Sequence, residues 1–463
     1  MTSNHDFLAR FKKALPQSII ITEKETLLTY GYDGTAGFLE IPSAVIFPKT
    51  VEEVSALVRV AYELGVPLIP RGAGTGLSGG SVPISNAVVV CLTMMDKIIE
   101  IDTKNLTILA ESGVVTQKLA NEASKVGLFY PPDPGSMAVS TIGGNVAENS
   151  GGLRGLKYGV TRNYVMGLEI VLPDGEVNWL GNKCVKDVAG LSLKDVFIGS
   201  EGTLGIITKV LLKLLPVQPY KKTMLVTFPD MDRAAQSVSD IIASKIIPCT
   251  LEFMDFTTIK CVEDYAKIGL PLDCQGAVLI ESDGHKAVVD EEFEEMVAIC
   301  KRNACMHVSV AANDVEANRL ASARRTAFSA LARIRPTTIL EDATVPRSEL
   351  AEFIRFIQAT ARKHNLLIGV FGHMGDGNLH PTVLTDERDN EEMNRVHTAF
   401  EEIFDKALQL GGTITGEHGV GLAKKPFLAK AVGLENIRLM QSLKKVVDPK
   451  NIMNPGKVID LQD

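Results

Sequence analysis

The chain has 463 residues, of which 45% are hydrophobic and 22% charged; this balance is typical of a globular protein and excludes a fibrous or largely disordered chain. At about 100–200 residues per domain, the length indicates two or three domains. The net charge of −8 disfavours nucleic acid as a partner, because affinity for the phosphate backbone needs clustered Lys and Arg.

The N-terminus and the apolar segments bear on where the protein acts. Residues 1–17 lack the apolar core of a signal peptide, and no stretch reaches the ~18–20 uncharged apolar residues of a membrane span. We therefore expect a cytoplasmic protein that meets a membrane only through a partner. The seven cysteines are scattered without a CxxC pair, so we expect reduced thiols rather than a disulfide frame, an iron–sulfur cluster or a thiolate–zinc site.

The first clear elements are a helix and a strand. The helix is predicted over residues 50–64, since Thr50 and Glu53 have capping-box spacing and Gly65 is placed to end it. A short strand over 66–70 follows and runs into a glycine-rich loop.

That loop, residues 71–80, reads RGAGTGLSGG and contains GxGxxG directly after a strand. A Rossmann site would require a helix to begin within the glycines, whereas a β-rich run over 87–92 comes next. A loop this poor in side chains still lets backbone N–H groups approach an anion closely, and Arg71 adds positive charge. The segment therefore predicts a phosphate-binding loop of a different kind.

Two further glycine-rich regions follow, and they are predicted as turns and loops. Residues 131–152 combine rigid proline turns with hydroxyls, amides and glycine, and residues 199–205 lead into a strand predicted over 205–215. Between them, strands over 166–172 and 176–180 flank a Pro-Asp-Gly turn and predict a hairpin. A single loop is explained by tight turns, but three close together predict a long, multiply charged cofactor.

After about Tyr220 glycine becomes scarce, and the pattern predicts a second α+β unit. Charged amphipathic stretches alternate there with short apolar runs. The predicted helices cover 230–245, 285–303, 346–364 and 388–410, and the predicted strands cover 276–281 and 366–371. Beyond Gly411 the chain is glycine-rich again and ends with a helix over 434–446 and a Pro/Asn-rich tail.

The sharpest signal is a pair of histidine-containing runs, FGHMGDGNLH and TGEHG. Two imidazoles and a carboxylate are usual ligands of an open catalytic metal site, which predicts a divalent cation held by His373, His380 and Glu417. The intervening glycines disfavour a continuous helix, so a hairpin-like loop is expected between the histidines. His418 is then available as a general base. The alternative is a set of hydrogen-bonded histidines in glycine turns.

With these residues the chain resembles the FAD-linked 2-hydroxy-acid dehydrogenases of the vanillyl-alcohol oxidase superfamily. The resemblance spans about Ser43 to Lys457 and rests on an ordered series of motifs: PRGAGTGLSGG, YPPDPGS, TIGGNVAENSGG, KYGVTRNYVMGLEIVLPDG, GSEGTLGIITK, GHMGDGNLH, GEHGVG and DPKNIMNPGK. This series is specific for the family and leaves the substrate open among glycolate, D-lactate, 2-hydroxyglutarate and larger hydroxy acids.

The resemblance implies an α+β fold with a two-lobed FAD-binding domain of the p-cresol methylhydroxylase (PCMH) type. A cap domain would carry an antiparallel sheet flanked by helices. The implied bounds are 1–217 for the FAD-binding domain, 218–410 for the cap or substrate domain, and 411–463 for a C-terminal segment that returns to the FAD-binding domain.

The resemblance also implies roles for individual residues. Those implied to line FAD are Arg71, Gly72, Ala73, Gly74, Thr75, Gly76, Ser78, Asp133, Pro134, Thr141, Gly144, Asn145, Gly152, Glu201, Gly205, Ile207 and Asn454. Thr75 stands where relatives with covalent FAD carry histidine, so the flavin is expected to bind non-covalently. His373, His380 and Glu417 would bind the metal, with Zn²⁺ or Mn²⁺ favoured and Fe²⁺ as a further alternative.

The substrate side of the implied site rests on three further residues. His418 would remove the proton of the hydroxyl, while Arg324 and Asn378 would bind the substrate. For Arg324 the alternative is a solvated charge on a helix. Ala321 stands where many relatives have tryptophan, so we expect a pocket of different shape.

The function implied is oxidation of a D-2-hydroxy acid to the 2-oxo acid, with hydride transfer to FAD. No cysteine cluster is available for onward electron transfer, so a separate acceptor is expected: a quinone-linked, iron–sulfur or electron-transferring flavoprotein partner, or else oxygen. The alternatives are a non-redox enzyme similar to ether-lipid synthases, which the polar run 372–380 disfavours, and a flavin electron carrier, which would need no metal ligands. The oligomeric state is open, a homodimer included.

Overall fold

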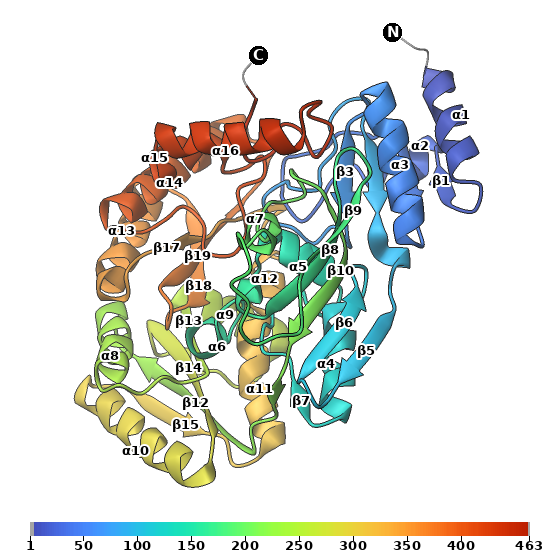
Figure 1. Ribbon diagram of the computed structural model, residues 1–463. Coiled ribbons are helices and arrows are strands. Elements are labelled where there is room, and N and C mark those ends of the chain that lie inside the picture. Colours follow the sequence, from blue (N-terminus) through green and yellow to red (C-terminus); the bar gives the residue numbers. More distant parts are fainter. Residues whose placement is uncertain (1–3, 462–463) are drawn as a thin grey trace. The chain divides into compact units, whose positions relative to one another are not determined.

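The computed structural model describes residues 4–461, which form two compact units, and most of their elements are labelled in Figure 1. The first unit contains the chain up to Ser150, Val160–Val217 and the C-terminal stretch from Glu417. The second contains Gly151–Gly159 and Gln218–Gly416. None of the helices between residues 4 and 461 is both long and apolar enough to cross a lipid bilayer.

These compact units differ from the predicted domain bounds at two places, and local contacts explain both. Residues 151–159 belong to the second unit, where the ammonium of Lys157 and the hydroxyl of Tyr158 donate to Asp283 at 2.5 and 2.7 Å. Residues 411–416 also belong to it, because Thr413 exchanges backbone hydrogen bonds with Thr344.

The N-terminal part of the first unit is a four-stranded sheet in the order β1-β2-β4-β3. Its strands β2, β4 and β3 run parallel, as expected when helical or loop crossovers join them. Helix α3 begins after Thr50, whose hydroxyl accepts from the N–H of Glu53, and ends at the left-handed Gly65, as predicted. The elements are α1 (Asn4–Ala14), β1 (Ile19–Ile21), α2 (Lys24–Leu28), β2 (Ala44–Phe47), α3 (Val51–Leu64), β3 (Leu68–Arg71) and β4 (Val88–Cys91).

A five-stranded antiparallel sheet, in the order β5-β6-β10-β8-β9, forms the rest of the core of this unit. The predicted hairpin around Pro173-Asp174-Gly175 is confirmed as β8 and β9. One expectation is wrong: residues from Ile142 are helical rather than turns, because Thr141 caps a short helix by accepting from Gly144 N–H. The elements are β5 (Ile98–Asp102), β6 (Thr107–Glu111), α4 (Thr116–Lys125), β7 (Leu128–Phe129), α5 (Ile142–Glu148), β8 (Val165–Val171), β9 (Val177–Gly181), α7 (Lys194–Phe197), β10 (Ile206–Lys213) and β11 (Leu215–Pro216).

The C-terminal segment packs into the first unit through main-chain and buried ionic contacts. It contains α15 (Lys425–Val432) and α16 (Leu434–Val447). Leu68 donates its N–H to Ile452 and accepts from Asn454 N–H, at 2.7 and 2.8 Å, so the tail lies beside β3. The buried Lys444 donates to Thr203 O, Met453 O and the Asp448 carboxylate at 2.6–2.7 Å. These contacts bring the tail to the strand that opens into the glycine-rich loop.

The second unit is built on an antiparallel sheet with the strand order β15-β12-β14-β13-β18-β19-β16, and β17 pairs with β19. The order does not follow the sequence, so strands from distant parts of the chain become neighbours at its centre. The strands are β12 (Tyr220–Phe228), β13 (Thr250–Asp255), β14 (Gly276–Gly284), β15 (His307–Val310), β16 (Thr337–Leu340), β17 (Ala343–Thr344), β18 (Leu367–His373) and β19 (Asn378–Thr385). The expected antiparallel sheet is confirmed.

Amphipathic helices accompany this sheet, and the four that the sequence predicted are present as α8, α10, α13 and α14. The helices are α6 (Gly155–Tyr158), α8 (Met231–Ala243), α9 (Phe256–Ala266), α10 (Lys286–Arg302), α11 (Asp314–Arg325), α12 (Ala327–Leu331), α13 (Leu350–Lys363) and α14 (Asn390–Gln409). Asp230 and Asp389 cap α8 and α14 by accepting from N–H groups of the first turn.

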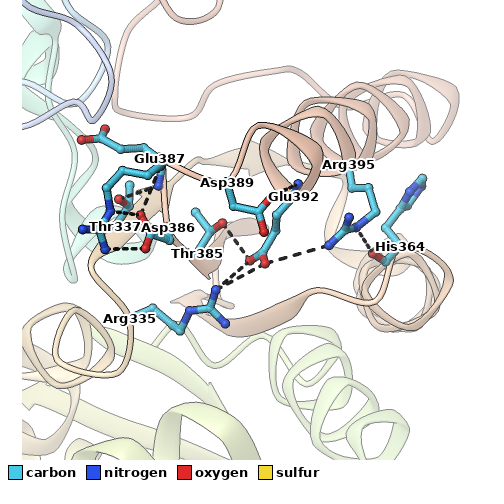
Figure 2. A network of polar contacts seen from close by, with 10 residues as sticks. Arg335, Thr337, His364, Thr385, Asp386, Glu387, Asp389, Glu392 and Arg395 are labelled. Atoms are coloured by element: carbon cyan, nitrogen blue, oxygen red, sulfur yellow. Dashed lines mark hydrogen bonds and ion pairs between the residues drawn. The ribbon is translucent and has the colours of Figure 1, made fainter.

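A polar network fixes the end of β19 to the start of α14 (Figure 2). Glu392, in the first turn of α14, accepts from the hydroxyl of Thr385 at 2.8 Å and from Arg335 at 3.3 Å. Arg395 approaches the same carboxylate and donates to the backbone oxygen of His364 at 3.0 Å. The network therefore anchors the C-terminal end of β19, and His380 lies near the other end of this strand.

Candidate active site

The hairpin of β18 and β19 positions both predicted histidine ligands. The register pairs Phe371 with His380 and His373 with Asn378, so these four side chains lie on one face of the sheet. The two imidazole rings are 5.1 Å apart between centroids and perpendicular. The expected hairpin is confirmed, although His380 lies within strand β19 rather than in the connecting loop.

The third predicted ligand follows a short segment that a buried carboxylate holds in place. Asp342, fully buried, accepts from the hydroxyl of Thr415 at 2.9 Å and from the N–H of Gly416 at 2.6 Å. A Cβ on Gly416 would lie 2.5 Å from the amide nitrogen of Asn378, so only glycine fits there. The next residue is Glu417, and one ligand atom from each of His373, His380 and Glu417 lies within 4.8 Å of the others.

This donor set fits a divalent cation. Two imidazoles and one carboxylate, two of them buried, form an incomplete coordination shell that leaves positions for substrate or water. His418, 9% exposed, follows the third ligand, and its Nε2 lies 3.8 Å from a carboxylate oxygen of Glu417.

Two buried charges lie behind His373. Its Nδ1 is 2.6 Å from Oε1 of Glu252, and Oε2 of the same carboxylate is 2.6 Å from Nε of Arg324. The second contact is an ion pair without the alignment of a hydrogen bond. The Arg324 guanidinium also stacks on Phe371, 4.5 Å from the ring centroid. At 6% exposed, Arg324 is not the solvated helix charge that the sequence left as an alternative.

In the first unit, the glycines of residues 71–80 differ in the space that a side chain would find. A Cβ on Gly72 would lie 2.2 Å from Thr141 Oγ1, and one on Gly74, whose φ is +74°, would lie 2.0 Å from the Arg71 guanidinium. At Gly76 the nearest atoms would be 3.7 Å away, which is ordinary van der Waals contact. Two of these glycines thus allow tight packing, whereas the neighbours of the third would tolerate a methyl group.

Arg71 stabilises this loop through hydrogen bonds of its guanidinium group. Its Nη1 donates to Tyr32 O at 2.7 Å and to Ser81 Oγ at 3.3 Å. Burial lowers the pKa of its guanidinium, and the carboxylate of Asp33 opposes that shift.

Asn454 joins this loop to the third glycine-rich region. Its Nδ2 donates to Gly80 O at 2.8 Å and to Glu201 O at 2.7 Å. Among the described residues, Ser78 Oγ, Asn454 Oδ1 and Lys457 Nζ are buried without a hydrogen-bond partner, and burial lowers the pKa of Lys457 to about 8. Buried groups of this kind require partners, so a polar cofactor with phosphates and hydroxyls fits this part of the unit.

A buried carboxyl pair supports the turn after His418. Glu201 accepts from the N–H groups of Val420 and Gly421 at 2.7 and 2.8 Å. Burial raises the pKa of Glu201 to about 7. Burial and the neighbouring Glu201 raise the pKa of Glu148 well above its ordinary value. Since Glu201 has two N–H donors and faces Lys424, Glu148 is the partner that keeps a proton.

Several predicted flavin residues have other contacts or positions in the structure. Asn145 donates to Thr116 Oγ1 at 2.6 Å and is buried. Gly205 packs against Val171 O and Ile207 lies in the core strand β10. Gly152 falls in the second unit. Asp133 and Pro134 lie buried in the loop between β7 and α5, and their role remains a prediction.

Four residues were not singled out from the sequence: Glu148, Glu252, Asp342 and Lys457. Glu148 and Lys457 stand inside two of the motifs quoted above, and a polar residue within a glycine-rich motif is a usable signal. Nothing nearby in the sequence distinguishes Glu252 or Asp342: the pairing of distant strands identifies Glu252, and hydrogen bonds to Thr415 and Gly416 identify Asp342.

Two family models match the chain. One, described as an FAD binding domain, matches residues 42–181. The other, described as the C-terminal domain of FAD linked oxidases, matches residues 217–458 and covers more than half of the chain.

Named relatives extend over nearly the whole sequence. Glycolate oxidase subunit GlcD of Bacillus subtilis is 52% identical over 431 residues, covering 93% of this chain and 92% of that protein. The Escherichia coli protein of the same name is 34% identical over 452 residues, covering 98% and 90%. A D-lactate dehydrogenase of Anaerostipes hadrus is 33% identical over 468 residues, covering 98% and 97%.

Solved structures agree on the fold. p-Cresol methylhydroxylase with substrate bound superposes with a TM-score of 0.82 at 19% identity, covering 100% of this chain and 98% of that one. An alkyldihydroxyacetonephosphate synthase superposes with a TM-score of 0.77 at 22% identity, covering 98% and 86%. Identities this low show the fold alone, and the expected PCMH-type fold is confirmed.

Proposed function

The chain belongs to the FAD-linked oxidases, and from this premise we propose that it oxidises a D-2-hydroxy acid, such as glycolate or D-lactate, at a metal-assisted site. It is an FAD-dependent oxidoreductase acting on hydroxy acids. The metal, the roles of single residues and the substrate within this class are the proposed part. Non-covalent binding of FAD, expected from Thr75, belongs to it as well.

The observation that carries the proposal is the convergence of His373, His380 and Glu417. A flavin electron carrier has no use for such a donor set, whereas a 2-hydroxy acid offers a carboxylate and a hydroxyl that chelate a cation. When bound, FAD accepts a hydride and the cation lowers the pKa of the substrate hydroxyl.

The remaining steps fall to side chains of this chain. His418 takes the hydroxyl proton, because it is buried and directly follows a metal ligand. Arg324 and Asn378 bind the substrate carboxylate and hydroxyl. Arg324 is preoriented for that role by Glu252 and Phe371. Charge-assisted hydrogen bonds from a fixed guanidinium give both affinity and orientation.

The test is a panel of 2-hydroxy acids, both enantiomers of each chiral one, scored by anaerobic bleaching of the flavin and by dye reduction before and after chelator treatment. We expect D-2-hydroxy acids or glycolate to bleach the flavin, and chelation to abolish turnover until a divalent cation is restored. Full turnover in the metal-free protein would contradict the metal-assisted mechanism. Absence of bleaching by every hydroxy acid would exclude the oxidation itself and favour the synthase-like or electron-carrier alternatives.

One variant tests the role of His418 as the base independently of FAD and metal binding. His418→Ala should lose about 10²–10⁴-fold in turnover, the usual contribution of general-base catalysis, and keep its FAD and its metal. His397 lies on the surface helix α14, so His397→Ala is the matched control and should retain activity.

For onward electron transfer we propose a separate quinone-linked, iron–sulfur or flavoprotein acceptor. Dye reduction without oxygen consumption would support this acceptor over oxygen.

A further inference from the structure

We propose that Glu252 is a positioning residue: it holds His373 in the tautomer that presents Nε2 to the metal, and it links this ligand to Arg324. The inference rests on the proposed function, since it concerns the same site. It is carried by contacts within the second unit alone.

The strand register makes the first contact a built feature of the sheet. β13 and β18 are antiparallel neighbours, and Glu252 is the direct cross-strand partner of His373. Directly paired residues project from the same face, with Cβ atoms about 5 Å apart. The carboxylate of Glu252, 1% exposed, thus reaches Nδ1 of His373 at 2.6 Å.

This contact selects the tautomer of the imidazole. A carboxylate accepts hydrogen bonds and cannot donate them, so the nitrogen facing it carries the proton. With the proton on Nδ1, the lone pair of Nε2 is available to a cation, and histidines bound to metals are commonly oriented by a carboxylate in this way.

The second contact explains how a carboxylate is tolerated at this depth. A buried charge without a partner is strongly destabilising, and Arg324 supplies the opposite charge at 2.6 Å. Arg324 uses Nε for this pair, and in the described part of the chain its terminal nitrogens form no hydrogen bond to the protein that would compete with a substrate. One carboxylate therefore orients both a metal ligand and the residue proposed to bind the substrate carboxylate.

Glu252→Gln tests the idea with almost no change in volume. The amide oxygen should turn toward Arg324, because the amide N–H₂ group would be repelled by the guanidinium. The N–H₂ group then faces Nδ1 of His373 and donates to it, which moves the imidazole proton to Nε2 and blocks the metal-binding nitrogen. The variant should thus invert the tautomer while the fold is kept.

Glu281→Gln is the matched control. Glu281 is a buried carboxylate on the neighbouring strand β14, and its polar partners among the described residues are Lys221, Thr223 and Thr250 rather than His373. Its replacement also removes a buried negative charge from the same sheet. Any effect common to both variants is therefore structural, and an effect confined to Glu252→Gln is specific to the site.

Two measurements on FAD-loaded protein decide the matter. Titration of the chelator-treated protein with Zn²⁺ should give a dissociation constant 10–100-fold larger for Glu252→Gln than for wild type, the usual effect of removing a ligand-orienting partner. Glu281→Gln should bind Zn²⁺ like wild type. ¹⁵N spectra of the histidine rings, with His373 assigned through His373→Gln, should show the proton on Nδ1 in wild type and on Nε2 in Glu252→Gln.

Each outcome is informative. An unchanged Zn²⁺ affinity and an unchanged tautomer in Glu252→Gln overturn the inference while the proposed function stands. If wild type binds no divalent cation, the metal-assisted function fails and the inference fails with it. If Glu252→Gln is too unstable to study, Glu252→Asp replaces it: the charge is kept, the reach is shorter by one methylene, and Zn²⁺ affinity between those of wild type and His373→Ala is expected.

Discussion

The carboxyl pair Glu148 and Glu201 predicts an unusual dependence of stability on pH. Burial raises the pKa of Glu148 well above the value of 4.5 that it has in the unfolded chain. Above that pH the folded protein holds a proton that the unfolded chain has released. The free energy of unfolding therefore falls as the pH rises toward the folded pKa of Glu148.

The contribution of Glu148 to this pH dependence follows from the single proton that its carboxyl group holds in the folded protein. The slope is about 1.4 kcal/mol per pH unit, which for a unit of this size corresponds to roughly 3–6 °C per pH unit in the midpoint of thermal unfolding. Glu148→Gln imitates the protonated side chain and removes the part of the slope that Glu148 contributes, while Glu201, whose pKa burial raises to about 7, adds its own slope in both proteins. We expect wild type and variant to unfold together below about pH 4, and the variant to be the more stable by several degrees at about pH 7.

The midpoint can be followed through flavin fluorescence, which rises when the first unit releases its FAD, at saturating FAD throughout. Glu169→Gln is the control, because Glu169 lies in the same unit and is ion-paired with Lys209 at 2.9 Å. That variant should shift the midpoint equally across the same pH range. A constant difference between wild type and Glu148→Gln from about pH 5 to about pH 8 would refute the buried proton.

Three further changes test the packing around the sites. Lys444→Met leaves Asp448 as an unpaired buried charge and should lower the free energy of unfolding by about 3–5 kcal/mol, measured in urea; a loss under about 1 kcal/mol would contradict the buried pair. Gly377→Ala puts a methyl group 2.1 Å from Val345 O at φ +88°, so Zn²⁺ binding should weaken, and unchanged binding would show that the hairpin adapts. Phe253→Ala in β13 should cost about 3–5 kcal/mol by the same denaturation, and a smaller loss would indicate that the core refills the cavity.

Features that depend on neighbours in sequence could be predicted. Thr50 and Gly65 bound their helix because a cap acts on the N–H groups of the adjacent turn and a left-handed glycine ends it. The hairpin of β8 and β9 follows from its Pro-Asp-Gly turn in the same way. The helix from Ile142 was missed, because its glycines are typical of a loop and one threonine cap outweighs them.

The partners of the site could not be predicted, because they come from segments far apart in the sequence that only the fold brings together. Glu252 precedes His373 by more than a hundred residues and lies beside it only through the pairing of β13 with β18. Asp342 holds Gly416 across a gap of 74 residues. Arg324 was singled out through the resemblance, and its burial against Phe371 decided between the two roles considered for it.

The sequence by itself determined which chemical groups are available: glycine-rich loops with free N–H groups, two histidines separated by glycines, and a Glu-His pair. It did so because those properties belong to short segments whose conformation is set locally. Only the tertiary structure decided which groups meet, since the register of a sheet depends on the packing of its whole face. That register places the carboxylate of Glu252 beside His373 and pairs the two strands that carry His373 and His380.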